Sequence, residues 1–383
     1  MKFLSKKGEK RLISEVVILS VIFGLAAGIV GQIITDVYID PFSQDYFYQN
    51  INTNQSIIEI PELRRVKRFL GIEQDFEVNK SVKQALPNLI GIYLKKPPSQ
   101  DILNQIYLSQ DLLGNGFILT SDGWLVTHQL VIGNQNPEQL VVIYQNKQYS
   151  IDQLIEDSMT GTVFLKVSAS NLPVAILGDS DENNSGQLAV SLNSLGVVVV
   201  TNIESPNYQQ RSKSSDFVLS SEQYFESILI ENNLSESYLG SPLLNLVGEV
   251  TGVIKEIDSA GGVALAVPIN QFRPVILNVL RDSLVKRPYL GVDYIDLARA
   301  VGGEQASNQG ALIYRPPLRN SPAADAGLQV DDIIVSIEGQ ILDMENNLTE
   351  IIQQYQPGDE LNLEIIRDSK RIDKKVVLSL LPE

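Results

Sequence analysis

Few side chains in this chain could carry out covalent chemistry. His128 is the only histidine, and there is no cysteine, which excludes disulfides, thiolate catalysis and a zinc site of the usual kind. We therefore expect no metal ion and no cofactor. A serine hydroxyl activated by an imidazole and oriented by a carboxylate would have to use this one histidine. The residues available for such a relay include His128, Asp157, Ser237 and Ser241.

The two serines belong to a stretch around which the rest of the chain is organised, residues 236–253, ESYLGSPLLNLVGEVTGV. Its pattern predicts a tight turn of small residues, a short apolar strand, a hairpin turn at 246–249 and a second strand. The stretch resembles the segment that carries the nucleophile in HtrA-type (Deg) trypsin-like serine proteases, where the family pattern is G-N-S-G-G-P-L-x-N-x-x-G-x-V-x-G. The positions that match without a gap are Gly240, Pro242, Leu243, Asn245, Gly248, Val250 and Gly252.

Other segments are similar to the same family and follow its order. Residues 114–127 resemble the strand pair G-x-G-F-I-x-x-x-D-G-x-I-x-T, and residues 177–180 resemble L-G-D-S. Segments similar to a bacterial PDZ domain lie at 289–292, 310–313, 321–328, 331–334, 357–359 and 363–367. The resemblance implies a mainly β fold, with a trypsin-like double six-stranded β-barrel followed by an α+β PDZ-like domain.

The residue pattern alone also predicts two folded domains. Short β-branched runs separated by Gly, Asn, Asp or Pro turns recur from residue 82 onward, and Asp122-Gly123 is a strong hairpin signal. Apolar residues at helical spacing in 271–284 close this region before a basic hinge at 286–288. We therefore assign residues 81–284 to the trypsin-like domain and residues 286–383 to the PDZ-like domain.

Each catalytic position of the family can be located on its own segment. The family pattern T-N-N-H-V-V aligns with residues 127–132 and places Leu130 at the histidine position. The alignment places Gly161 at the aspartate position and Leu239 at the nucleophile position, while Ser237 replaces the first glycine of the oxyanion hole. Because Leu130, Gly161 and Leu239 cannot exchange protons, the resemblance implies a pseudoprotease.

A catalytic relay displaced onto neighbouring residues is the alternative. His128 lies two residues before Leu130, and Ser241 lies two residues after Leu239. Two residues of extended chain move a side chain by about 6.6 Å, whereas proton transfer needs heavy atoms within roughly 2.6–3.2 Å. Several displacements would therefore have to compensate one another. We expect instead that Leu130 and Leu239 face each other as a buried apolar plug between the barrels.

We expect the PDZ-like domain to carry the remaining activity of the protein, which is peptide binding. Its family binds C-terminal or extended peptides by adding a strand to a sheet edge, and backbone N–H groups of one loop hold the terminal carboxylate. The alternative is that this domain only packs on the protease fold. The residues expected to bind peptide are Tyr289, Leu290, Gly291 and Val292 in that loop, and Leu348, Ile351 and Ile352 on the following helix.

The first 80 residues predict a membrane anchor. Residues 1–11 have five basic side chains against one acidic one, and residues 12–35 have few polar side chains and the length of a membrane-spanning helix. The basic flank orients residues 1–11 toward the cytoplasm. A cleaved signal peptide is the alternative. Residues 36–80 form a juxtamembrane linker, in which a trimer contact or a membrane-interface belt is predicted at Tyr46, Phe47 and Tyr48.

The net charge and the resemblance to HtrA-type proteases together limit the functions that we expect for this chain. The chain has 30 Lys and Arg against 46 Asp and Glu, a net charge of −16, which argues against a nucleic-acid partner. We predict a membrane-anchored, extracytoplasmic, catalytically inactive HtrA-like protein. It would bind C-terminal or unfolded polypeptide, as a homotrimer or in a mixed oligomer with an active relative. The alternatives are an active serine endopeptidase of envelope protein quality control with a relocated triad, and a structural subunit of a larger envelope complex.

Overall fold

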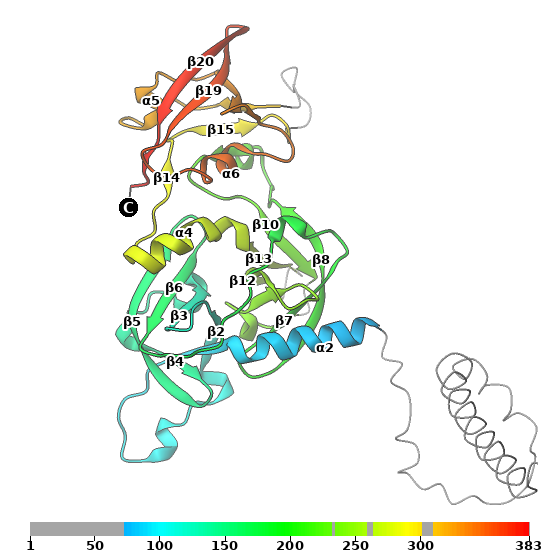
Figure 1. Ribbon diagram of the computed structural model, residues 1–383, viewed down its shortest axis with the longest axis vertical. Helices are drawn as coiled ribbons and strands as arrows, with labels where there is room; N and C mark the ends of the chain where they lie inside the picture. Colours follow the sequence, from blue (N-terminus) through cyan, green and yellow to red (C-terminus); the bar gives the residue numbers. More distant parts are fainter. Residues whose placement is uncertain (1–72, 232–233, 259–262, 301–308, 383) are drawn as a thin grey trace, which may run out of the picture. The chain divides into compact units, whose positions relative to one another are not determined.

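The computed structural model describes residues 73–231, 234–258, 263–300 and 309–382 (Figure 1). The predicted cytoplasmic segment (1–11), anchor (12–35) and Tyr46, Phe47 and Tyr48 lie outside the described residues, as does the linker (36–80) up to residue 72. Among the helices within the described ranges, none is both long enough and apolar enough to cross a bilayer.

Helix α2 (Glu73–Ala85) precedes the first barrel and packs on the protease-like core. Val78 and Val82 contact the core cluster, and the Ser81 hydroxyl donates a hydrogen bond to the Asn245 carbonyl at 3.1 Å. This helix therefore covers the hairpin that follows the nucleophile position. Short 3₁₀ turns lie elsewhere at η4 (Leu86–Asn88), η5 (Ile102–Gln105), η6 (Ser109–Asp111), η7 (Pro137–Gln139), η8 (Ser180–Glu182), η9 (Ser214–Phe217) and η10 (Glu236–Tyr238).

The first barrel closes in the strand order β1-β2-β3-β6-β5-β4. Its strands alternate apolar side chains into a core that includes Ile90, Leu125 and Leu165. The predicted Asp122-Gly123 turn joins β2 to β3. The elements are β1 (Leu89–Leu94), β2 (Leu112–Ile118), β3 (Trp124–His128), α3 (Gln129–Ile132), β4 (Leu140–Tyr144), β5 (Lys147–Asp157) and β6 (Thr162–Val167).

The second barrel closes in the order β10-β13-β12-β11-β7-β8. Helix α4 (Ile269–Asp282) follows it, and the edge-to-face pair of Phe164 with Phe272, 6.4 Å between ring centroids, joins the helix to the first barrel. One apolar cluster includes Phe117, Val190 and Val275, so the two barrels and the helix share a core. The strands are β7 (Leu188–Leu192), β8 (Val198–Tyr208), β10 (Ser227–Glu231), β11 (Pro242–Leu244), β12 (Val250–Asp258) and β13 (Val263–Pro268).

The C-terminal domain is built on one sheet in the order β20-β19-β17-β16-β15-β9, with β18 paired to β17. Strand β14 pairs with β21 in a separate two-stranded sheet, and α6 lies beside β15 (Figure 1). The elements are β14 (Pro288–Tyr289), β15 (Asp293–Asp296), β16 (Ala311–Ile313), α5 (Pro322–Asp325), β17 (Ile333–Ile337), β18 (Gln340–Ile341), α6 (Leu348–Ile352), β19 (Glu360–Arg367), β20 (Lys370–Val377) and β21 (Ser379–Leu380).

Strand β9 (Val218–Ser220) is unexpected in this sheet, because it comes from the connection between β8 and β10 of the second barrel. The C-terminal sheet is therefore completed by a segment that lies about seventy residues earlier in the chain than its partner β15.

The basic hinge predicted at 286–288 is a buried junction at Arg287, whose side chain is 1% exposed. Its Nε donates to Asp157 Oδ1 at 3.1 Å, and its Nη2 donates to the Gln271 carbonyl at 2.7 Å. Its Nη1 also donates to Gln353 Oε1 at 3.3 Å. The guanidinium thus joins the end of β5, helix α4 and the C-terminal domain, because its five donors can reach all three.

Candidate functional site

The loop that the family pattern aligns with the nucleophile forms a tight turn and uses backbone donors for internal hydrogen bonds. The Leu239 N–H donates to the Glu236 carbonyl at 3.0 Å, and the Leu239 carbonyl accepts from the Asn115 N–H at 2.7 Å. Gly240 has φ +73°, and a Cβ there would lie 2.2 Å from the Asn115 carbonyl oxygen. The Leu239 N–H is therefore not free to stabilise an oxyanion.

The apolar plug predicted from Leu130 and Leu239 is wrong. Leu130 is 59% exposed, whereas Leu239 is half-buried against the core of the first barrel. Leu130 lies on the one-turn helix α3, whose buried positions are taken by Val131 and Ile132. Because a four-residue helix presents one narrow face to the core, the Leu130 side chain is left in solvent.

Gly161, which the family pattern aligns with the aspartate, lies against the His128 ring. It has φ +68°, and a Cβ there would lie 2.7 Å from His128 Nε2. Its N–H donates to the Asp157 carbonyl and its carbonyl accepts from the Gln129 N–H, both at 2.8 Å. The imidazole therefore fills the space that a side chain at residue 161 would need.

His128 is 6% exposed and ends strand β3. Its Nδ1 accepts a hydrogen bond from the Leu130 N–H at 3.2 Å. Burial lowers the pKa of His128 to about 4, the charge of Lys255 acts in the same direction, and a hydrogen bond to the Thr160 backbone opposes both. Within the described ranges, no serine hydroxyl or carboxylate is hydrogen-bonded to this ring.

The other candidates for a displaced relay also have different partners. Asp157 is 0% exposed, and besides Arg287 it accepts a hydrogen bond from the Thr160 hydroxyl at 2.6 Å. Ser241 Oγ is buried without a hydrogen-bond partner among the described residues. Ser237 Oγ lies 2.8 Å from Ser235 Oγ. The structure does not bring these side chains together with His128.

The seven residues expected to bind peptide fall into two adjacent groups. Leu290 and Val292 share one apolar cluster with the buried helix residues Leu348, Ile351 and Ile352. Their packing follows from the helix period, because residues three and four apart lie on the same face. Tyr289 is also buried but lies outside that cluster. Gly291 has φ +86°, and a Cβ there would lie 2.3 Å from Ser321 Cβ, so only glycine fits this turn.

Sequence reasoning missed the segment that contacts this loop. Glu222 Oε1 accepts hydrogen bonds from the Leu290 N–H at 3.2 Å and the Gly291 N–H at 2.9 Å. Leu219, on β9, is 4% exposed and belongs to the same apolar cluster. The only signal was a short apolar pair, Val218-Leu219, followed by two serines and an acid.

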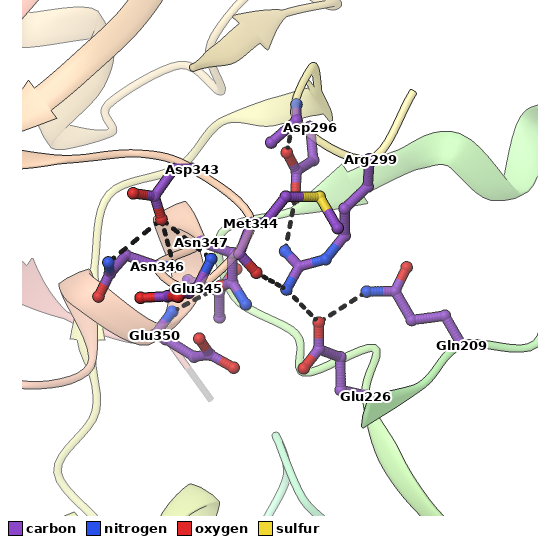
Figure 2. A network of polar contacts seen from close by, with 12 residues as sticks. Gln209, Glu226, Asp296, Arg299, Asp343, Met344, Glu345, Asn346, Asn347 and Glu350 are labelled. Atoms are coloured by element: carbon purple, nitrogen blue, oxygen red, sulfur yellow. Dashed lines mark hydrogen bonds and ion pairs between the residues drawn. The ribbon is translucent and has the colours of Figure 1, made fainter. Parts of the chain in front are cut away.

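A polar network lies beside this segment (Figure 2). Arg299 forms ion pairs with Glu226 at 3.0 Å and Asp296 at 2.7 Å, and Gln209 donates to Glu226 at 2.8 Å. Burial and the negative charge of Glu226 together raise the pKa of Glu350 to about 7, against the opposing charge of Arg299. The network therefore contains a carboxyl group that titrates near neutral pH.

Comparison with known proteins agrees with this architecture. Residues 288–378 match the PDZ domain family. Proteins named "Probable periplasmic serine endoprotease DegP-like" from Pseudomonas putida (strain GB-1) and Pseudomonas fluorescens are each 30% identical over 288 residues, 71% of this chain and 57% of the relative. The chain thus covers little more than half of the length of these relatives.

Solved structures show the same fold. The structure described as "HtrA-type protease AlgW with decapeptide" is 22% identical, covers 80% of this chain and 99% of that chain, and superposes with a TM-score of 0.59. The serine endoprotease from Yersinia pestis is 20% identical, covers 80% and 98%, and has a TM-score of 0.51. Two β-barrels followed by a PDZ domain define a trypsin-like protease fold with an appended PDZ domain. Within that class, this chain is similar to HtrA and DegP-like serine proteases.

Proposed function

We propose that this protein is an HtrA-like pseudoprotease that binds polypeptide through its PDZ domain and does not cleave it. The observation that carries the proposal is the set of residues at the catalytic positions, Leu130, Gly161 and Leu239, together with a buried His128 that has no serine partner among the described residues. Loss of a catalytic triad costs on the order of 10⁶ in kcat. The internal hydrogen bond of the Leu239 N–H removes an oxyanion donor as well.

The binding role rests on the loop 289–292 and helix α6. The backbone of the loop presents adjacent N–H groups at Leu290 and Gly291 to a carboxylate oxygen, and the buried face of α6 supplies the apolar wall beside it. This is the arrangement by which PDZ domains capture an extended peptide with a terminal carboxylate. Solved HtrA-type relatives are described as complexes with a decapeptide and a tripeptide. The expected ligands are C-terminal or unfolded polypeptide segments.

The same proposal places the protein outside the cytoplasm, held by residues 12–35, with 81–284 and 286–383 as its two extracytoplasmic domains. The periplasmic location in the names of the relatives supports this side of the membrane. In a homotrimer, or in a mixed oligomer with an active relative, the protein could deliver bound polypeptide to an active protease or keep it away from that protease.

A protease assay separates this proposal from an endopeptidase with a relocated triad. The full chain in detergent is incubated with fluorogenic casein, beside the variants Ser241→Ala and His128→Ala. We expect no hydrolysis above the buffer control from any of the three proteins. Hydrolysis by the unmodified chain that either substitution abolishes would establish the endopeptidase instead.

A further inference from the structure

The edge of the PDZ sheet that would accept a peptide is already paired. Strand β9 runs antiparallel to β15, with Val218 opposite Ile295, Leu219 opposite Tyr294 and Ser220 opposite Asp293. The pairing continues one residue further, because the Ser221 N–H donates to the Val292 carbonyl at 3.0 Å. The other side of β15 pairs with β16. An incoming strand therefore finds no free edge on β15.

The side chains of residues 218–222 also lie where the side chains of a bound peptide would lie. Alternate residues of a strand point to the same face, and both Leu219 and Ser221 are buried, at 4% and 0% exposure. Leu219 packs in the cluster with Leu290 and Ile351, and the Thr349 hydroxyl donates to the Ser220 carbonyl at 3.3 Å. The apolar wall of the groove is thereby covered.

A carboxylate occupies the loop as well. Glu222 Oε1 accepts from two successive backbone N–H groups, those of Leu290 and Gly291, at 3.2 and 2.9 Å. Successive N–H groups of this kind form an anion-binding nest. A C-terminal ligand would supply its main-chain carboxylate there, but this chain continues to Gln223, so a side chain supplies the group.

We propose that residues 218–222 are a built-in ligand of the PDZ groove, with the Glu222 side chain in place of a terminal carboxylate, so that external peptides bind by displacing this segment. The inference rests on the proposed function, since it assumes that the groove takes peptides at all. It adds that the groove is self-occupied, and that the competing ligand class is extended peptide with a free carboxyl terminus.

Residues that flank the segment on both sides hold it beside the groove. Arg299 of the PDZ domain pairs with Glu226, which follows the segment, and Gln209, which precedes it, donates to the same carboxylate (Figure 2). Tethering of this kind gives an effective concentration in the millimolar range. An external peptide therefore binds with its intrinsic affinity reduced by the fraction of molecules whose groove is open.

Displacement can be measured with a labelled peptide. The probe is a fluorescein-labelled hexapeptide of the sequence of residues 216–221, DFVLSS, with a free carboxyl terminus. Its anisotropy is titrated with the full chain in detergent, with Glu222→Gln, which removes the carboxylate, and with Leu219→Asp, which expels the strand. We expect both variants to bind the probe about tenfold more tightly or better, while the control Glu138→Gln, at an exposed site in η7, binds like the unmodified chain.

A disulfide lock makes the test independent of variant stability. Ser220 and Asp293 lie directly opposite each other, at a spacing that a disulfide can bridge, and the chain has no other cysteine to interfere. The double variant Ser220→Cys and Asp293→Cys should lose probe binding on oxidation and regain it on reduction.

The outcomes separate the two proposals. Equal affinity in all variants, or binding that survives the disulfide, would overturn the built-in ligand and leave peptide binding intact. No binding by any of them, Leu219→Asp included, would overturn both.

Discussion

At the scale of single residues, the side chains near the aligned catalytic positions pack against one another or form ion pairs. His128 lies against Gly161, whose missing side chain gives the ring its place, and the acid nearby, Asp157, is held by Arg287. The residues that could have formed a relay are therefore committed to the stability of the first barrel and its junction with the PDZ domain.

We expect the pKa of His128 to lie well below that of a free imidazole. Since it is the only histidine, its ring signals can be followed by NMR without assignment, and we expect a pKa of about 4 in the folded protein. The unfolded chain has a pKa near 6.5 and binds more protons between these values. The contribution of His128 to stability is thus present above about pH 6.5 and lost toward pH 4. A folded pKa near 6.5 would show that the ring is exposed.

Introducing an acid at residue 161 should destabilise the protein. Gly161→Asp introduces a Cβ 2.7 Å from His128 Nε2 at a φ of +68°, and we expect a loss of about 1–3 kcal/mol in urea unfolding. Gly186→Asp is the control, because Gly186 has φ +81° and nothing lies within 4 Å of its Cβ position. Equal losses in the two variants would mean that backbone strain, and not the contact with His128, determines the cost.

The sequence motifs predict which residues lie at the three catalytic positions, and this stays a prediction. What the motifs could not give is where the replacements point. The exposure of Leu130 depends on which face of α3 the core takes, and the pairing of His128 with Gly161 joins residues on separate segments.

At the scale of elements, the strands of both barrels follow from β-branched runs and turns, and the Asp122-Gly123 turn lies where the pattern predicted it. Strand β9 could not be predicted. A three-residue strand carries almost no periodic signal, and its partner lies far along the chain, so only the folded PDZ groove specifies the pairing.

The stability of the protein should depend on the ionisation of Glu350, which lies on helix α6. Glu350 has a folded pKa of about 7, raised by burial and by Glu226 and Asp181 and opposed by Arg299. The folded state therefore holds an extra proton between about pH 4.5 and 7, and this carboxyl lowers stability as pH rises through that range. We expect Glu350→Gln to melt several degrees above the unmodified chain at pH 8 and at a similar temperature at pH 5, by differential scanning calorimetry. His128 is present in both proteins, so its opposite contribution to the pH dependence of stability cancels in the comparison. The same difference in melting temperature at pH 5 and pH 8 would contradict the raised pKa of Glu350.

At the scale of the whole molecule, the contacts that join the described domains include the buried Arg287–Asp157 ion pair, the Arg299–Glu226 ion pair and the pairing of β9 with β15. Arg287 contacts the first barrel, helix α4 and the PDZ domain, while β9 extends from the second barrel into the PDZ sheet. The sequence predicted a basic hinge at this point, at residues 286–288. Burial of the guanidinium depends on Asp157, 130 residues earlier.

Removing this junction should uncouple the domains. Arg287→Ala leaves the Asp157 carboxylate buried without its partner, which costs about 3–5 kcal/mol. We expect one calorimetric transition for the unmodified chain, and two transitions at lower temperature for this variant. Arg371→Ala removes an exposed ion pair with Glu364 and should change stability by less than about 1 kcal/mol. A cooperative transition that Arg287→Ala leaves unchanged would show that other contacts couple the domains.

The central claim, that no serine in this fold is activated for attack, is tested most directly by covalent labelling. The full chain in detergent is incubated with a fluorophosphonate probe, with an active trypsin-like protease as the positive control, and the intact mass of each protein is measured. We predict stoichiometric labelling of the control and no adduct on this protein. An adduct that Ser241→Ala or His128→Ala abolishes would contradict the claim.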